Sequence, residues 1–101
     1  DITAHAELLL VQKVQSLLTQ EELKLSTLYS STEPCPMCAG AIYWAGIGKV
    51  VFGCSTKELY QIAGDGLLLR AKDIFESGCH EVMTKDYSHI EKYKEVHKKF
   101  W

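Results

Sequence analysis

The chain has 101 residues, of which 47% are hydrophobic and 24% charged, and its formal net charge is −2. This length allows at most one domain, and the composition is typical of a globular protein with a hydrophobic core. The slightly acidic balance provides no overall attraction to nucleic acid, and the sequence contains neither a membrane-length apolar run nor a signal-peptide pattern. We therefore expect residues 1–101 to form a single cytoplasmic domain without membrane contact.

The first half of the chain predicts a helix followed by a strand. Apolar residues at three- and four-residue spacing indicate an amphipathic helix over residues 4–18, with Thr3 as its N-cap. The expected apolar face consists of Ala6, Leu10, Val14, Leu17 and Leu18. Residues 25–31 are rich in β-forming side chains and predict a strand.

The second half predicts further strands separated by helices. Pro36 fits the first position of a helix, because its missing N–H costs nothing there, and this helix should stop near Gly46 or Gly48. A short strand, a mixed helical and loop segment, another strand and a lysine-rich helix are expected at residues 49–53, 56–78, 80–84 and 88–100. Strand–helix–strand order predicts a right-handed crossover between parallel strands, and the long following connection again favours a parallel neighbour. The sequence therefore predicts an α/β fold of three layers.

Two short motifs predict a metal centre. His5 and Glu7 lie two residues apart, and residues 33–38 read Glu-Pro-Cys-Pro-Met-Cys. Residues two apart on a helix point about 200° apart, so His5 and Glu7 cannot both be equal ligands of one ion. Cys35 at a helix N-cap and Cys38 one turn later can direct both sulfurs to one point. Together with His5 they predict a three-ligand Zn²⁺ site with an open position for water, whose proton Glu7 is free to move.

The cysteines allow two other interpretations. A structural zinc site needs a fourth ligand, and Cys54, Cys79 and His80 are candidates, but only the neighbouring Cys79 and His80 have a short spacing. Four cysteines could also form disulfides in three pairings, but Cys35 and Cys38 are too close together to suit such a framework. Cysteine clusters in reducing compartments usually bind metal or catalyse, so we favour catalytic zinc.

These motifs, together with Leu28, Tyr29 and the run of residues 39–44, resemble the cytidine/deoxycytidylate deaminase superfamily. Within it, the chain is similar to the branch of guanine deaminases, tRNA-specific adenosine deaminases and fungal-type cytosine deaminases. The resemblance implies a three-layer α/β/α sandwich of the cytidine deaminase-like type, one Zn²⁺ per chain and a homodimer. The implied reaction is hydrolytic deamination, with Glu7 carrying protons from water to the base and to the departing ammonia.

The choice of substrate is less sharply indicated. Pro36 and residues 40–44 look more like guanine deaminases than tRNA editors, which often have an aliphatic residue at the position of Pro36. Asp65 resembles an acidic proton shuttle, although Asp between glycines is also typical of a turn, and Trp101 resembles an aromatic C-terminus that closes over the pocket. The other expected substrate contacts are Ala6, Glu33 and Pro34. We favour guanine, with adenosine in tRNA, cytosine and a non-catalytic partner subunit as alternatives.

The front of the chain departs from the pattern of this family. Relatives place a helix and a two-stranded hairpin before the His-x-Glu helix, whereas this chain begins almost on that motif. The missing strands usually pair with the strand around Leu28 and supply an asparagine to the substrate pocket. We therefore expect an exposed strand edge at Leu28. The segment has been cut off, lies outside the given sequence or comes from another chain, and these three explanations stay open.

Overall fold

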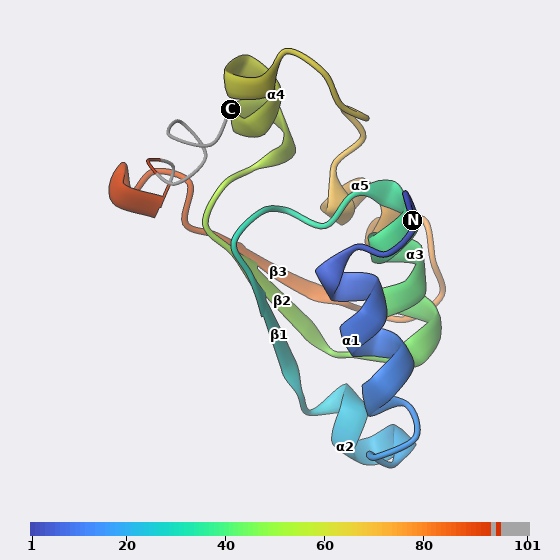
Figure 1. The fold of residues 1–101 in the computed structure, drawn as a ribbon. Coiled ribbons are helices and arrows are strands. Elements are labelled where there is room, and N and C mark those ends of the chain that lie inside the picture. Colours follow the sequence, from blue (N-terminus) through green and yellow to red (C-terminus); the bar gives the residue numbers. More distant parts are fainter. Residues whose placement is uncertain (94, 96–101) are drawn as a thin grey trace.

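The computed structural model describes residues 1–93 and 95 (Figure 1). The helices and strands follow one another in the order α1 (Ala6–Val14), α2 (Gln20–Lys24), β1 (Thr27–Ser30), α3 (Pro36–Ala45), β2 (Lys49–Phe52), α4 (Thr56–Ala63), α5 (Ala71–Glu76) and β3 (Met83–Asp86). The terminal helix expected over residues 88–100 lies only partly within the described residues, because residues 94 and 96–100 are outside them. None of the described helices is long and apolar enough to cross a membrane.

The three strands form one parallel sheet in the order β1-β2-β3. Leu28 of β1 pairs in register with Val50 of β2, which pairs with Thr84 of β3. Helices α1 and α5 both pack against α3, and these three helices lie on the same side of the sheet (Figure 1). The predicted α/β class and parallel pairing are confirmed, and the described residues supply the sheet and one helical layer of the sandwich. Within them, β1 is an edge strand, as expected.

The hydrophobic core lies between the sheet and this helical layer. Its centre is formed by Ile42 of α3 and Val50 of β2, both of which are fully buried. The remaining buried members come from most elements and comprise Val11, Leu23, Leu28, Ala39, Ala45, Ile47, Phe52, Ala71, Phe75 and Val82. Because β2 is the central strand, its alternate residues anchor both neighbouring strands and the helices above them.

Helix α1 differs from its prediction at both ends. The N-cap is His5, in an extended conformation with φ −68° and ψ 147°, and the Thr3 hydroxyl instead donates to the Asp1 carboxylate at 2.8 Å. The helix ends at Val14 rather than at residue 18. Its buried residue is Val11. Two residues of the expected apolar face, Val14 and Leu18, pack against the core. The other three, Ala6, Leu10 and Leu17, are exposed, so the predicted face is confirmed only in part.

Helix α2 was not predicted, and the start of strand β3 was misplaced. Helix α2 begins with a capping box, in which the Thr19 hydroxyl accepts from the Glu22 N–H and the Glu22 carboxylate accepts from the Thr19 N–H. Strand β3 begins at Met83, three residues later than predicted. The preceding loop is held by Tyr43, whose ring stacks on His80 and whose hydroxyl accepts from the Cys79 N–H at 2.6 Å, so these residues cannot join the sheet.

Replacing Gly48 with Ala should destabilise the protein by about 1–3 kcal/mol, the usual cost of overpacking. A Cβ at Gly48 would collide with the backbone carbonyl of Lys24, which no side-chain rotation can relieve. Gly40→Ala is the matched control, because a Cβ at Gly40 in helix α3 meets nothing within 4 Å. Urea unfolding should show Gly40→Ala to be neutral or more stable, and equal stability of both variants would contradict this packing at Gly48.

Candidate metal centre

The predicted metal ligands converge. The Nδ1 atom of His5 lies 3.5 Å from the sulfur of Cys35 and 3.5 Å from the sulfur of Cys38. One donor atom from each residue falls within 4.8 Å of the others. Among the described residues, these three form the group of His, Cys, Asp or Glu side chains that could hold a metal ion. The structure therefore brings the nitrogen of His5 together with two sulfurs that lie 30 and 33 positions later in the sequence.

Local structure at two helix starts creates this convergence. His5 is the N-cap of α1, and Cys35 is the N-cap of α3, whose first residue is Pro36 as predicted. Cys35 makes no side-chain capping bond, so its sulfur is directed to the cluster instead of the helix backbone. Cys38 follows within the first turn of α3 and is completely buried, whereas His5 is exposed. The cluster is therefore closed on the Cys38 side and open to solvent on the His5 side.

The donor set fits Zn²⁺. Zinc–sulfur and zinc–nitrogen bonds are about 2.3 Å and 2.0–2.1 Å long. In a tetrahedron these lengths separate the nitrogen from each sulfur by about 3.5 Å. The two measured nitrogen–sulfur distances have this value, 3.5 Å. Three protein ligands leave the fourth tetrahedral position for water or substrate, which is the arrangement of catalytic rather than structural zinc.

The remaining cysteines do not complete a four-ligand structural site. None of the four cysteines forms a disulfide. Cys54 is buried and its thiol donates to the Ser55 carbonyl, while Cys79 is exposed in the loop held by Tyr43. Neither joins the cluster within the part of the chain that the structure describes. The described residues therefore form neither a disulfide framework nor a metal site with a fourth cysteine ligand.

Glu7 lies beside the cluster without belonging to it. The Ser30 hydroxyl, at the end of β1, donates to Oε1 of Glu7 at 2.9 Å. The Glu7 carboxylate also interacts with the Cys38 thiol, as a minor contributor to the raised pKa of that thiol. Sequence reasoning did not single out Ser30, and its one visible signal is a hydroxyl residue at the end of the strand that leads to the cysteine motif.

The Cys38 thiol has a strongly perturbed pKa. Burial, and next the neighbouring sulfur of Cys35, raise the pKa of Cys38 to about 12. The metal-free protein therefore keeps this proton throughout the neutral range. A metal ligand must be a thiolate, so binding of the ion has to displace the proton.

Glu33, predicted as a substrate contact, has both carboxylate oxygens engaged by the protein. Oε1 accepts from the Thr56 N–H at 2.8 Å, and Oε2 accepts from the Ala71 N–H at 2.7 Å. The side chain is buried, with 8% of its surface exposed. These contacts link the cysteine motif to the first residues of α4 and α5.

The other predicted substrate residues lie in different settings. Ala6 is exposed at the start of α1, next to the ligand His5, and Pro34 is fully buried next to Cys35. Asp65 is exposed, and its carboxylate accepts from the Gly66 N–H at 2.8 Å, as in the turn interpretation. Trp101 lies outside the described residues. Their roles with substrate stay predictions.

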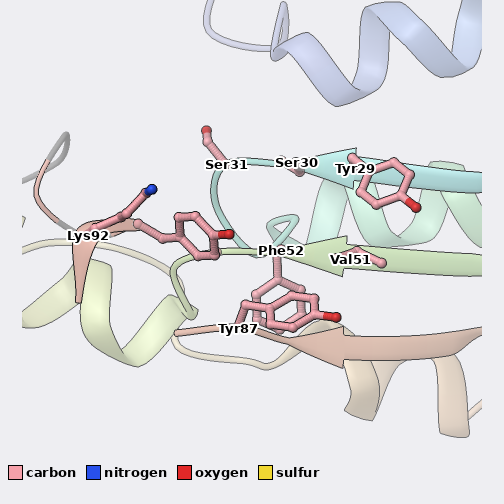
Figure 2. Close-up of a pocket in the computed structure, with 9 residues that line it drawn as sticks. Tyr29, Ser30, Ser31, Val51, Phe52, Tyr87 and Lys92 are labelled. Carbon is pink, nitrogen blue, oxygen red and sulfur yellow. The ribbon is translucent and has the colours of Figure 1, made fainter. Parts of the chain in front are cut away.

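One surface hollow has a volume of about 720 Å³ (Figure 2). It lies along the sheet strands and is lined by Tyr29, Ser30, Ser31, Val51, Phe52, Gly53, Tyr87, Lys92 and Tyr93. None of the predicted ligands or substrate contacts lines it. The hollow therefore does not contain the metal cluster, although Ser30, which donates to Glu7, forms part of its lining.

Replacing Cys35 with Ser should reduce the Zn²⁺ content from about one per chain to a small fraction, because a hydroxyl is a far weaker ligand than a thiolate. Cys79→Ser is the matched control and should retain full zinc, since Cys79 is exposed and outside the cluster. Elemental analysis after exhaustive dialysis measures both. Equal zinc loss in the two variants would show that the ligand set is assigned incorrectly.

The affinity for Zn²⁺ should rise with pH, by about tenfold per pH unit for each proton that the ion displaces. The sign follows from the raised pKa of Cys38, which keeps the thiol protonated and makes acid a competitor of the metal. Competition with a chelating dye at several neutral pH values measures the slope, and proton release in weakly buffered solution checks it. An affinity independent of pH would contradict thiolate ligation.

Comparison with known proteins agrees with this site. Residues 1–54 match the cytidine and deoxycytidylate deaminase zinc-binding region. The chain is 37% identical over 87 residues to a probable cytosine deaminase of Schizosaccharomyces pombe, covering 81% of the chain and 52% of that protein. It is 53% identical over 45 residues to guanine deaminase of Bacillus subtilis, covering 45% and 29%. It is 48% identical over 50 residues to tRNA-specific adenosine deaminase of Bacillus subtilis, covering 50% and 31%.

The chain thus spans about half of the first of these relatives and less than a third of the other two. The matched zinc-binding region contains all three residues of the cluster and Glu7. On this evidence, the chain belongs to the cytidine and deoxycytidylate deaminase family of zinc-binding deaminases.

Proposed function

We propose that the protein is a Zn²⁺-dependent hydrolase that deaminates a nucleobase or nucleoside and releases ammonia. The observation that carries this proposal is the position of Glu7, a carboxylate held by Ser30 beside a cluster of three metal ligands but outside it. A metal centre with one open position and an adjacent acid–base group is the equipment that hydrolytic deamination needs.

The mechanism assigns a separate task to each part of the site. His5, Cys35 and Cys38 would hold the ion. When bound, Zn²⁺ supplies Lewis acidity that lowers the pKa of a coordinated water to about 7. Glu7 takes a proton from the attacking water and delivers it to a ring nitrogen of the base. The carboxylate then moves the second proton to the amino group, which leaves as ammonia while the ring carbon gains a carbonyl oxygen.

Two features of the protein prepare the site for this chemistry. The hydrogen bond from Ser30 to Oε1 restrains rotation of the carboxylate, which limits the loss of conformational freedom when the base binds. The start of α3 contributes first-turn N–H groups that no side chain caps, and these favour negative charge near the sulfurs. Both features stabilise the charged groups that the reaction requires.

Guanine is the substrate that we favour. Pro36 and residues 40–44 resemble guanine deaminases, and the 45-residue match to the Bacillus subtilis guanine deaminase has 53% identity. The longer match to a probable cytosine deaminase supports cytosine as the alternative, and the matches to tRNA-specific adenosine deaminases support tRNA. The net charge of −2 argues for a small base over a polyanion. A homodimer and a cytoplasmic location stay predictions.

The zinc-loaded protein should release ammonia fastest from guanine when guanine, cytosine, adenosine and a tRNA anticodon stem-loop are compared under the same conditions. A coupled ammonia assay measures each rate, and chromatography identifies the product base. The highest rate on cytosine or on the stem-loop would transfer the assignment to that alternative. Zinc-loaded protein that is inactive on all four would favour the non-catalytic partner subunit and contradict the proposed enzyme.

Glu7→Gln separates the proposed chemistry from metal binding. The amide cannot accept a proton, so the rate should fall by about 10²–10⁴-fold, the usual contribution of general acid–base catalysis. The zinc content should not change, because Glu7 lies outside the ligand cluster. Glu21→Gln, at an exposed position in α2, is the matched control and should retain both activity and zinc. Loss of zinc in Glu7→Gln would instead identify Glu7 as a ligand.

A further inference from the structure

Glu33 forms three short hydrogen bonds to parts of the chain that are distant in sequence. Its carboxylate accepts from the N–H groups of Thr56 and Ala71, at 2.8 and 2.7 Å. Its own N–H donates to the carbonyl of Cys54 at 2.7 Å. A buried carboxylate is costly unless its oxygens are satisfied, and here two backbone donors satisfy one oxygen each. Glu33 therefore links three distant parts of the chain through buried hydrogen bonds.

The two donors are the first residues of helices. Thr56 begins α4 and Ala71 begins α5, and first-turn N–H groups have no acceptor within their own helix. The N-cap residue of α5, Arg70, makes no side-chain capping bond, so Glu33 supplies the acceptor that the local sequence lacks. One carboxylate thus holds the starts of α4 and α5. The loop that carries Asp65 lies between these two helices in the sequence.

The charge of Glu33 is felt in the same region. The pKa of Arg70 is raised, mainly by its hydrogen bonds with Asp73 and to a smaller extent by the nearby Glu33 carboxylate. Arg70 is exposed and held in a two-point contact with Asp73. Glu33 therefore lies near a cation as well as accepting from two backbone donors.

The connection runs directly into the metal centre. Glu33 precedes the ligand Cys35 by two residues, and the intervening Pro34 is fully buried. The pyrrolidine ring of Pro34 restricts the backbone, and Cys35 then starts α3, which carries Cys38. We call the hydrogen bonds from Thr56 and Ala71 to the Glu33 carboxylate the clamp. Because the backbone between the clamp and Cys35 is restricted, a shift of Glu33 also moves the metal ligands. Helix α5 also packs against α3, so the metal-bearing helix contacts the clamped segment a second time.

We propose that Glu33 is a positioning residue that couples the metal centre to the starts of α4 and α5. Binding of Zn²⁺ to the cluster and order at the N–H groups of Thr56 and Ala71 then stabilise each other. The coupling concerns the metal centre alone, so it holds or fails independently of which base the protein deaminates.

Glu33→Gln tests the clamp with almost no change in volume. The amide keeps one acceptor oxygen but presents an NH₂ group to the second backbone donor, so one hydrogen bond becomes a repulsive contact. We expect Zn²⁺ affinity, measured by competition with a chelating dye, to weaken at least tenfold. Glu22→Gln is the matched control, because its carboxylate also caps a helix, α2, that supplies no metal ligand. Its zinc affinity should stay within twofold of the wild type.

Hydrogen exchange provides a second measurement, which applies to the wild-type chain as well as to the variant. In the wild-type chain, removal of Zn²⁺ with a chelator should accelerate exchange of the Thr56 and Ala71 amides at least tenfold, while the Glu22 amide of the α2 cap changes little. In Glu33→Gln, the same two amides should exchange fast with and without the ion. Wild-type exchange that ignores the metal, or a destabilised Glu33→Gln with wild-type zinc affinity, would overturn the coupling and leave a purely structural role.

Discussion

Two helix starts must meet at one point, and most of the structure serves this requirement. The nitrogen of His5 and the sulfurs of Cys35 and Cys38 lie within 4.8 Å although they belong to α1 and α3. Such closeness needs α1 to pack against α3 on the same face of the sheet, with a fixed start for each helix. Pro36 determines where α3 starts, because proline fits the first turn of a helix but not its interior. The core residues Ile42 and Val50 then hold α3 on the sheet.

The site also shows how buried polar groups divide their tasks. Cys38 and Glu33 are both buried, but their environments differ. The Cys38 thiol is buried beside the sulfur of Cys35, which raises its pKa, and a metal cation must displace its proton to bind. Glu33 is instead surrounded by backbone donors that satisfy its charge within the protein. One buried group can thus bind an external cation, while the other has its hydrogen bonds completed within the protein, and only Pro34 separates Glu33 from the first cysteine ligand.

Much of the fold follows from local sequence. The start of α3 at Pro36, its end before Gly46 and the parallel strands on either side were predicted from proline chemistry, glycine position and strand–helix–strand order. Gly46 has a φ of 87°, a left-handed conformation that a glycine adopts without strain. The errors fell where a distant contact decides the boundary. Tyr43 holds His80 in the loop before the last strand, which therefore begins at Met83 and not at residue 80. Contact with α3 selects Val11 over Leu10 as the buried residue of α1.

The sequence by itself determined the chemistry of the centre: which atoms are soft ligands, that His5 and Glu7 cannot be equal ligands, and that α3 begins at the cysteines. Those properties depend on residue type and helical period, which are local. Only the tertiary structure decided that Ser30 restrains Glu7 and that Glu33 joins α4 and α5, since each contact spans more than 20 residues. No local pattern encodes such pairs, because they exist only after the sheet and its helical layer have brought the separate helix starts together.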